Sequence, residues 1–246
     1  MGNILKTGVN TDIEQQKELF LSTLLHDIKN PLLAQIAGLK FLKSEADNIL
    51  NKEQKEILDL SLESSEHLSE LLLSVLSIYK FENGVITLNK KYFEIDTLVE
   101  ICIKEALLLA RNKNVSVSFC GAKKSVYADE EQIKRVVENL LINAVSYCYE
   151  NSSINVEIKV NDENIVLSFE NYSPEIPKLT AENMFEKFVS SGDRYAKTSM
   201  GLGMYLSRKI IEAHGGRIWL EACAEKNKFI FTLPLNLQKI GRVIFD

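Results

Sequence analysis

Two long stretches at the start of the chain repeat apolar residues at the spacing of an α-helix, and they limit the folds available to it. They cover about residues 12–44 and 53–82, on either side of the polar segment "KSEADNILNKEQ". A helix of about thirty residues is roughly 45 Å long. Two such helices cannot bury continuous apolar stripes as a lone hairpin. The pattern therefore predicts that the hairpin pairs with a second copy, giving a four-helix bundle in a homodimer.

After residue 85 the pattern changes to short alternating strands mixed with helices. Strands are predicted at 85–89, 92–95, 115–120, 153–162 and 164–171, helices at 96–114, 129–150 and 201–216, and a closing hairpin at 217–235. Asp96 is expected to cap the first of these helices. Such a mixture is typical of a two-layer α/β sandwich. The predicted fold class is α+β, with a tail over 1–14, a dimerisation hairpin over 15–84 and a sandwich domain over 85–246.

The composition excludes several classes of function. The net charge of −5 gives no indication of a basic surface that would bind nucleic acid or an anionic membrane. We find no apolar run of about eighteen residues and no signal-peptide pattern, so no membrane segment is expected within the chain. The expected location is cytoplasmic, with the alternative that the chain is the soluble core of a longer membrane-bound protein. The four cysteines lack metal-site spacing and are expected to be buried free thiols. His214 is expected to be a cation at a helix C-terminus, and Trp219 to pack in the core.

The segment "HDIKNP", residues 26–31, places a proline inside the first helical pattern. Proline in a helix interior costs about 3 kcal/mol, and Pro31 therefore marks a point where the helix can bend. His26 offers a neutral, nucleophilic imidazole near neutral pH, and the adjacent Asp27 can orient it and accept its proton. Asn30 lies one helical turn from His26. Taken alone, the same pattern fits a solvated histidine on a kinked helix.

Two further motifs suggest a nucleotide site. Asn139 and Asn143 are one turn apart on a predicted helix and share a face. Gly201 and Gly203 stand at a helix N-terminus, where backbone N–H groups and the helix dipole favour phosphate. A Gly-x-Gly pattern alone is weak evidence.

Five motifs occur in one order: "HDIKNP", "ENLLINAVSY", "FENYSPEIP", "MFEKF" and "GLGM". In this order the chain resembles the catalytic core of a two-component sensor histidine kinase over about residues 15–236, the five matching its H-, N-, G1-, F- and G2-boxes. The resemblance implies a dimeric phosphoacceptor hairpin followed by a Bergerat-type ATP-binding domain. It also implies ATP and Mg²⁺ as cofactors, and the receiver domain of a response regulator as partner.

The resemblance carries roles to individual residues. It implies that His26 accepts the phosphoryl group, with Asp27 beside it and Asn30 placing water in the phosphatase direction. It implies that Asn143 binds Mg²⁺, and that Asn139 and Tyr147 contact phosphate or sugar. The remaining nucleotide contacts it implies are Asn171, Ile176, Phe188, Gly201, Leu202, Gly203 and Met204. The stretch 189–200 is expected to be a lid over ATP, with Arg194 and Lys197 as candidate phosphate partners or merely solvated charges.

The chain departs from the family pattern at the G1-box, where Asn171, Ser173 and Glu175 occupy the positions of an aspartate and two glycines. An asparagine carbonyl still accepts a hydrogen bond from an adenine amine. Ser146 replaces the usual lysine of the N-box. Two alternatives to a kinase stay open: a phosphatase-biased enzyme, and a non-catalytic dimeric scaffold with a degenerate ATP site.

Overall fold

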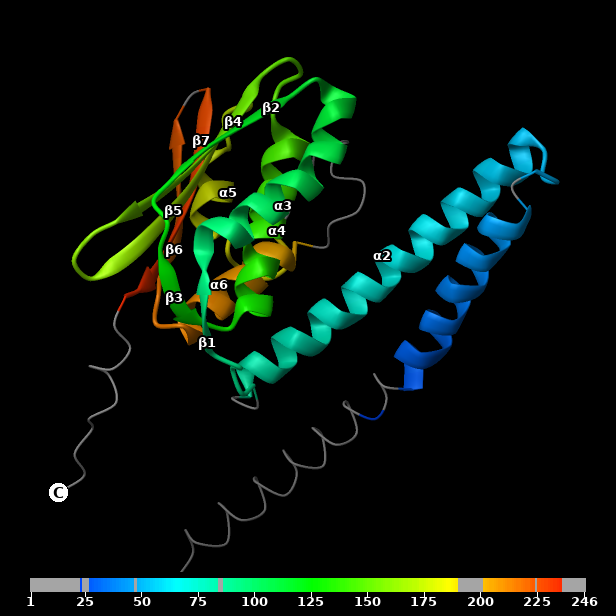
Figure 1. The fold of residues 1–246 in the computed structure, drawn as a ribbon, viewed down its shortest axis with the longest axis horizontal. Coiled ribbons are helices and arrows are strands. Elements are labelled where there is room, and N and C mark those ends of the chain that lie inside the picture. The colour runs from blue at the N-terminus through cyan, green and yellow to red at the C-terminus, as the bar shows by residue number, and fades with distance from the viewer. Residues whose placement is uncertain are drawn as a thin grey trace, which may run out of the picture. The chain divides into compact units, whose positions relative to one another are not determined.

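The computed structural model of the 246-residue chain describes residues 23, 27–46, 48–83, 86–189, 201–223 and 225–235. The chain forms two compact units, Met1–Lys80 and Phe81–Asp246, drawn in Figure 1. Each unit is described by itself.

The first unit is a helical hairpin. A helix over residues 27–46, continuous through Pro31, is followed by α2 (Lys52–Glu82), whose last two residues belong to the second unit. Asn51 and Gln54 form a capping box at the start of α2: the Gln54 N–H donates to Asn51 Oδ1 (2.9 Å), and the Asn51 N–H donates to Gln54 Oε1 (3.0 Å). These reciprocal bonds satisfy donors that a helix start leaves free, which explains where α2 begins.

A small apolar core joins the two helices of the hairpin. Leu32 and Ile36 of the first helix pack with Leu62 of α2. Two cross-helix ion pairs flank this core, Lys40 with Glu66 (2.7 Å) and Lys43 with Asp59 (2.8 Å). Other large apolar side chains of the hairpin stay exposed: Leu33, Phe41, Leu42, Ile57, Leu60, Leu68 and Val75. The hairpin therefore buries only part of its apolar surface.

The second unit is a mixed α/β domain. Its strands are β1 (Lys91–Glu94), β2 (Ser116–Gly121), β3 (Ser125–Ala128), β4 (Ser153–Val160), β5 (Asn164–Tyr172), β6 (Ile218–Cys223) and β7 (Lys226–Pro234). Its helices are α3 (Ile95–Ala110), a 3₁₀ turn (Arg111–Lys113), α4 (Glu130–Tyr147), α5 (Lys178–Asn183) and α6 (Gly203–Ala213).

Five of these strands form one sheet in the order β2-β4-β5-β7-β6, antiparallel except for the parallel pair β2–β4. β1 and β3 form a separate antiparallel pair. Helices α3, α4 and α6 cover one face of the large sheet (Figure 1). The predicted two-layer sandwich is confirmed.

The core of this unit lies between the sheet and the helices. Alternate residues of the two central strands are buried on the helix-facing side, and Phe169 of β5 stacks near Phe231 of β7 with ring centroids 6.2 Å apart. Leu140 and Leu141 of α4 are fully buried. On the other face of β5 and β7 most side chains are partly exposed, except for Ser168 and Ile230, which are also buried.

Several local predictions were wrong. Residues 86–90 form no strand, and β3 and α5 were not predicted. Helix α3 begins one residue before Asp96, with Glu94 at the N-cap, so Asp96 lies buried in the first turn. These segments are short, and their positions depend on tertiary pairing such as β1 with β3 rather than on local pattern.

His214 is not a surface cation. It is 1% exposed; its Nε2 accepts from the Asp129 N–H (3.0 Å) and its Nδ1–H donates to the Ile210 carbonyl (2.8 Å). Burial lowers the pKa of this imidazole, and the two bonds require its neutral form. The Asp129 carboxylate in turn accepts from the Gln132 and Asn89 N–H groups. His214 thus fastens the end of α6 to the start of α4.

Trp219 and two of the cysteines also differ from expectation. Trp219 is half-buried on strand β6, where its indole N–H donates to Glu221 (3.1 Å). Cys120 and Cys223 are exposed, whereas Cys102 and Cys148 are buried free thiols as expected. Among the described residues, no helix is long and apolar enough to cross a bilayer.

Candidate functional site

The two asparagines of α4 meet the start of α6. Asn139 donates from Nδ2 to Ser207 Oγ (2.9 Å), and Asn143 donates from Nδ2 to Met204 Sδ (3.1 Å). Both asparagines are half-buried, and Met204 is 9% exposed. The structure therefore brings together Asn139, Asn143 and the first turn of α6.

Gly201 and Gly203 are needed at the start of α6 because a Cβ at either position would collide with neighbouring atoms. Gly201 has φ of +67°, and a Cβ there would lie 2.4 Å from the Val189 carbonyl oxygen. A Cβ on Gly203 would lie 2.5 Å from Asn139 Oδ1. Leu202 between them is 4% exposed and anchors the turn in the core. The N-terminal N–H groups of α6 thus stand beside the amides of α4, an arrangement suited to phosphate.

The G1 segment begins at the end of β5. Asn171 is 1% exposed, and its Oδ1 has no hydrogen-bond partner among the described residues. Ser173 is also buried, whereas Glu175 is exposed and Ile176 is half-buried. The buried acceptor on Asn171 is the group that a donor on a ligand would satisfy.

Tyr147 is the last residue of α4 and is half-buried. The carbonyls just before it are capped by Lys113, whose ammonium donates to Val145 (3.1 Å) and Ser146. A cation at this position suits the negative end of the α4 dipole. Lys113 was not predicted from the sequence as a capping residue. It lies 32 residues before Val145 in the chain, and only the fold brings the two together.

The F-box splits into a buried and an exposed aromatic residue. Phe185 is 9% exposed, whereas Phe188 is 69% exposed and has φ of +62°. A phenylalanine in the left-handed region stores backbone strain of about 1–3 kcal/mol. A contact between Phe188 and nucleotide stays a prediction.

The hairpin residues of the H-box lie in the other unit. Asp27 and Asn30 are exposed on the first helix. His26 falls outside the described residues, as do Arg194 and Lys197 of the expected lid.

The residues present fit a magnesium nucleotide. With Asn143 Nδ2 engaged by Met204, the amide oxygen is the atom left to serve as an oxygen ligand, the type that Mg²⁺ prefers. Among the described residues, no group of three or more His, Cys, Asp or Glu side chains forms a metal cage. Mg²⁺ bound with nucleotide commonly takes one or two protein oxygens and completes its shell with phosphate oxygens and water. The unpaired oxygen of Asn171 fits the amine of adenine.

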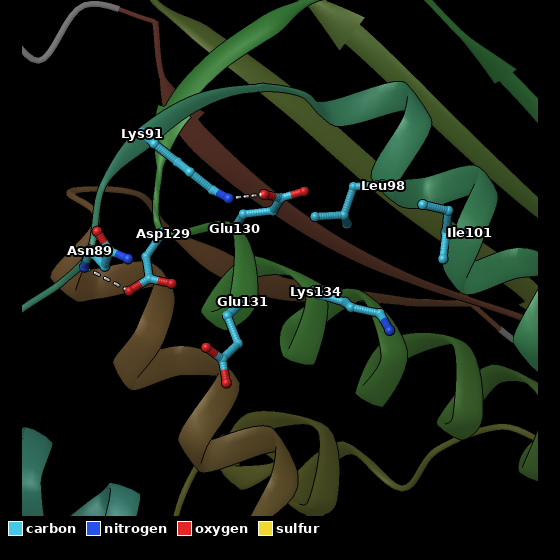
Figure 2. A pocket seen from close by; sticks show the side chains of 8 residues that line it. All are labelled: Asn89, Lys91, Leu98, Ile101, Asp129, Glu130, Glu131 and Lys134. Atoms are coloured by element: carbon cyan, nitrogen blue, oxygen red, sulfur yellow. Dashed lines mark hydrogen bonds and ion pairs between the residues drawn. The ribbon is translucent and has the colours of Figure 1, made fainter.

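A pocket of about 330 Å³ lies elsewhere, beside the N-terminus of α4 (Figure 2). Both of its lysines are engaged in ion pairs: Lys91 with Glu130 of the lining (2.6 Å), and Lys134 with Glu138, which lies outside the lining (3.1 Å). None of the residues that the sequence singled out as contacts lines this pocket. We therefore assign the site to the α4–α6 junction instead.

Two family models match the chain. The His Kinase A (phospho-acceptor) domain matches residues 16–84, and the Histidine kinase-, DNA gyrase B-, and HSP90-like ATPase matches residues 128–237. Sensor protein VanSC of Enterococcus gallinarum is 29% identical over 91% of this chain and 62% of its own length. Sensor protein KdpD of Clostridium acetobutylicum is 24% identical over 87% of this chain and 24% of its own length. The chain thus spans less than two thirds of these relatives.

Solved structures of two proteins are also similar to this chain. The catalytic domain of histidine kinase ThkA is 29% identical, covers 61% of this chain and 99% of its own, and has a TM-score of 0.56. The fold also resembles full-length ShkA in complex with AMPPNP, at 22% identity and a TM-score of 0.74 over 87% of this chain and 45% of that one. With an H-box domain and an ATPase domain in this order, the chain belongs to the family of sensor histidine kinases.

Proposed function

We propose that the chain is the core of an ATP-dependent protein-histidine kinase. His26 takes the γ-phosphoryl group of Mg-ATP, and the group then passes to an aspartate of a response-regulator receiver domain. The observation that carries this proposal is the contact of the α4 amides with the glycine turn of α6, in the domain that matches the ATPase family. ATP and receiver proteins are cytoplasmic, so the proposed reaction takes place there.

Each part of the site has a task in this reaction. The α6 N–H groups receive phosphate oxygens, the Asn143 oxygen holds the metal ion, and Asn139 keeps the turn in place through Ser207. The metal supplies neutralisation of the developing phosphate charge. Positioning of this kind accounts for most of the catalysis in phosphoryl transfer.

The chemical step requires little from the hairpin beyond a neutral imidazole. A His26 ring nitrogen forms the N–P bond as the bond from the γ-phosphorus to the bridging oxygen breaks, and ADP leaves. Asp27 receives the proton of the other ring nitrogen. Asn30, exposed one turn along the helix, is placed to hold a water molecule when the phosphoryl group is later hydrolysed.

The exposed apolar side chains of the hairpin support a homodimer. Ile57, Leu60, Leu68 and Val75 stand three, eight and seven residues apart along α2, which keeps them near one face of the helix, and all are exposed in the single chain. Pairing with a second hairpin removes this surface from water.

The proposal is tested by incubating the full chain with Mg²⁺ and γ-labelled ATP, then exposing the product to acid. We expect label that acid removes, as phosphohistidine requires, and its loss in His26→Ala. His67→Ala, which changes a half-buried histidine of α2, is the control and should keep the label. Acid-stable label, or label retained in His26→Ala, would contradict the proposal.

The altered G1 segment favours one competing function. A site without the G1 aspartate would bind ATP poorly and leave mainly phosphatase activity that depends on Asn30. Dephosphorylation of a phosphorylated receiver domain without labelling from ATP would select this alternative. A chain that binds no Mg-ADP in calorimetry and removes no phosphate would instead be a scaffold.

A further inference from the structure

Two buried asparagines lie opposite each other on β5 and β7, near the end of β5 where the G1 segment begins. The register of β5 and β7 places Asn171 opposite Asn227, two residues from the pair Phe169 and Phe229. Both asparagines are 1% exposed, and the alternation of the strands puts them on the face covered by helices. Opposite residues on one face of an antiparallel pair have Cβ atoms about 5 Å apart. The two amides therefore stand side by side.

The amide of Asn227 is held in one orientation. Its Nδ2 donates to Ser173 Oγ and to the Pro174 carbonyl (3.2 Å), while the Ser173 N–H donates to the Glu225 carbonyl (3.3 Å). These bonds tie the G1 segment to the β6–β7 hairpin. Because the nitrogen is engaged on the G1 side, the oxygen of Asn227 is the atom left unpaired.

Both amide oxygens lack donors. Asn171 Oδ1 and Asn227 Oδ1 are fully buried and have no hydrogen-bond partner among the described residues. A buried polar atom without a partner is unfavourable, and native proteins rarely tolerate two together. Two acceptors cannot satisfy each other, whereas a single ligand atom that carries two hydrogens can donate to both.

We propose that Asn227 is a second base-contacting residue, which selects 6-aminopurine nucleotides together with Asn171. The exocyclic amine of adenine carries two N–H groups on one nitrogen, one for each amide oxygen. A 6-oxo purine such as hypoxanthine would bring a third acceptor to the same place. This inference rests on the proposed ATP-binding function and adds a residue that the sequence motifs do not mark.

The experiment measures the dissociation constants of Mg-ADP, Mg-IDP and the Mg-diphosphate of purine riboside, which lacks the amine, by calorimetry on the full chain. In the unaltered chain we expect Mg-ADP to bind more tightly than either analogue. In Asn227→Ala the preference for Mg-ADP over the purine riboside nucleotide should fall about fivefold. Asn155→Ala changes an exposed asparagine on the other face of the same sheet, and should leave this preference within about twofold of the original.

The outcomes separate the inference from the proposed function. If Mg-ADP binds but Asn227→Ala weakens all three nucleotides equally, Asn227 only holds the G1 segment or a buried water, and the inference is wrong. If the unaltered chain binds none of the three, the nucleotide site itself is refuted and the inference with it. Should Asn227→Ala fail to fold, Asn227→Ser replaces it, since its side chain ends one atom short of the amide oxygen. The same loss of preference is expected there.

Discussion

Gly203 has no Cβ, and this allows the first turn of α6 to lie close to Asn139 in the candidate nucleotide site. In Gly203→Ala the new Cβ would lie 2.5 Å from Asn139 Oδ1, so the Asn139 amide must shift, which disturbs its bond with Ser207. We expect unfolding to become easier by about 1–3 kcal/mol, as for other overpacked sites, and Mg-ADP to bind at least about tenfold more weakly. Urea unfolding and calorimetry measure the two effects.

Gly38→Ala is the matched control, because nothing lies within 4 Å of a Cβ built on Gly38. It should stabilise the first helix by about 0.5–1 kcal/mol and leave Mg-ADP affinity unchanged. Equal nucleotide affinity in both variants would show that the α4–α6 contact does not shape the site.

His214 makes the stability of the second unit depend on pH. Burial lowers its pKa below the ordinary value of 6.5, so the folded state resists protonation more than the unfolded state does. Its contribution is fully present above about pH 6.5 and is lost as the pH falls through the lowered pKa. We expect the unaltered chain to lose more stability between about pH 7.5 and pH 5.5 than His214→Gln, measured by urea unfolding. The same loss in both chains would refute the buried neutral histidine.

For single residues, the sequence predicted the contacts that depend on local spacing but not those that depend on the fold. Asn139 and Asn143 share a helix face, as their spacing predicted. His214 differs, because its bond partner Asp129 is 85 residues away and only the fold brings the two together. The alternation of the last hairpin did contain a signal for Asn227, an amide at a buried position of a strand.

Glu82, which is the last residue of α2 and part of the second unit, contacts one side chain of the F-box segment and one of α6. Glu82 forms an ion pair with Lys187 and accepts a hydrogen bond from Tyr205. The bond with Lys187 lowers the pKa of Glu82, whereas burial and the neighbouring Glu82 raise the pKa of Tyr205 to about 12. Within the second unit, Glu82 is thereby held against Lys187 and Tyr205.

This cluster predicts a late-titrating tyrosine. Because the pKa of Tyr205 is raised above its ordinary value of 10, its stabilising effect is present below pH 10 and is lost as the pH rises toward about 12. In an absorbance titration, one of the eight tyrosines should ionise late. Tyr205→Phe should remove that transition, and Glu82→Gln should move it to lower pH. An unchanged transition in Glu82→Gln would contradict the contact.

Whole elements were predictable where their pattern is long. Helix α4, with its acidic first turn and apolar stripe, and the strand pair β4–β5 follow from local sequence. Short elements such as β3 and α5 did not, because four to six residues carry too little periodicity. The extent of each domain in the intact protein stays a prediction.

For the molecule as a whole, the apolar surface of the hairpin predicts a dimer. In sedimentation at micromolar concentration we expect twice the mass of one chain, and Leu60→Lys should shift the equilibrium toward the monomer. Leu60 is 64% exposed in the single chain. Leu108→Lys alters a residue of α3 with nearly equal exposure, 65%, and should leave the dimer intact. A monomeric unaltered chain would contradict the four-helix bundle.

The architecture of the molecule was the most predictable level, since the two helical stripes, the mixed α/β pattern and the order of five motifs all agree with the observed fold. The chemistry of the base site was least predictable, because it depends on the β5–β7 register.

The central claim is that a nucleotide held at the α4–α6 junction phosphorylates the histidine of the hairpin. The most direct measurement is to incubate the full chain with Mg-ATP and to locate the added phosphoryl group by mass spectrometry, with handling and fragmentation at neutral pH. We predict modification of His26 in the unaltered chain and none in Asn143→Ala. A phosphoryl group on any other residue, or modification of His26 that persists in Asn143→Ala, would contradict the account.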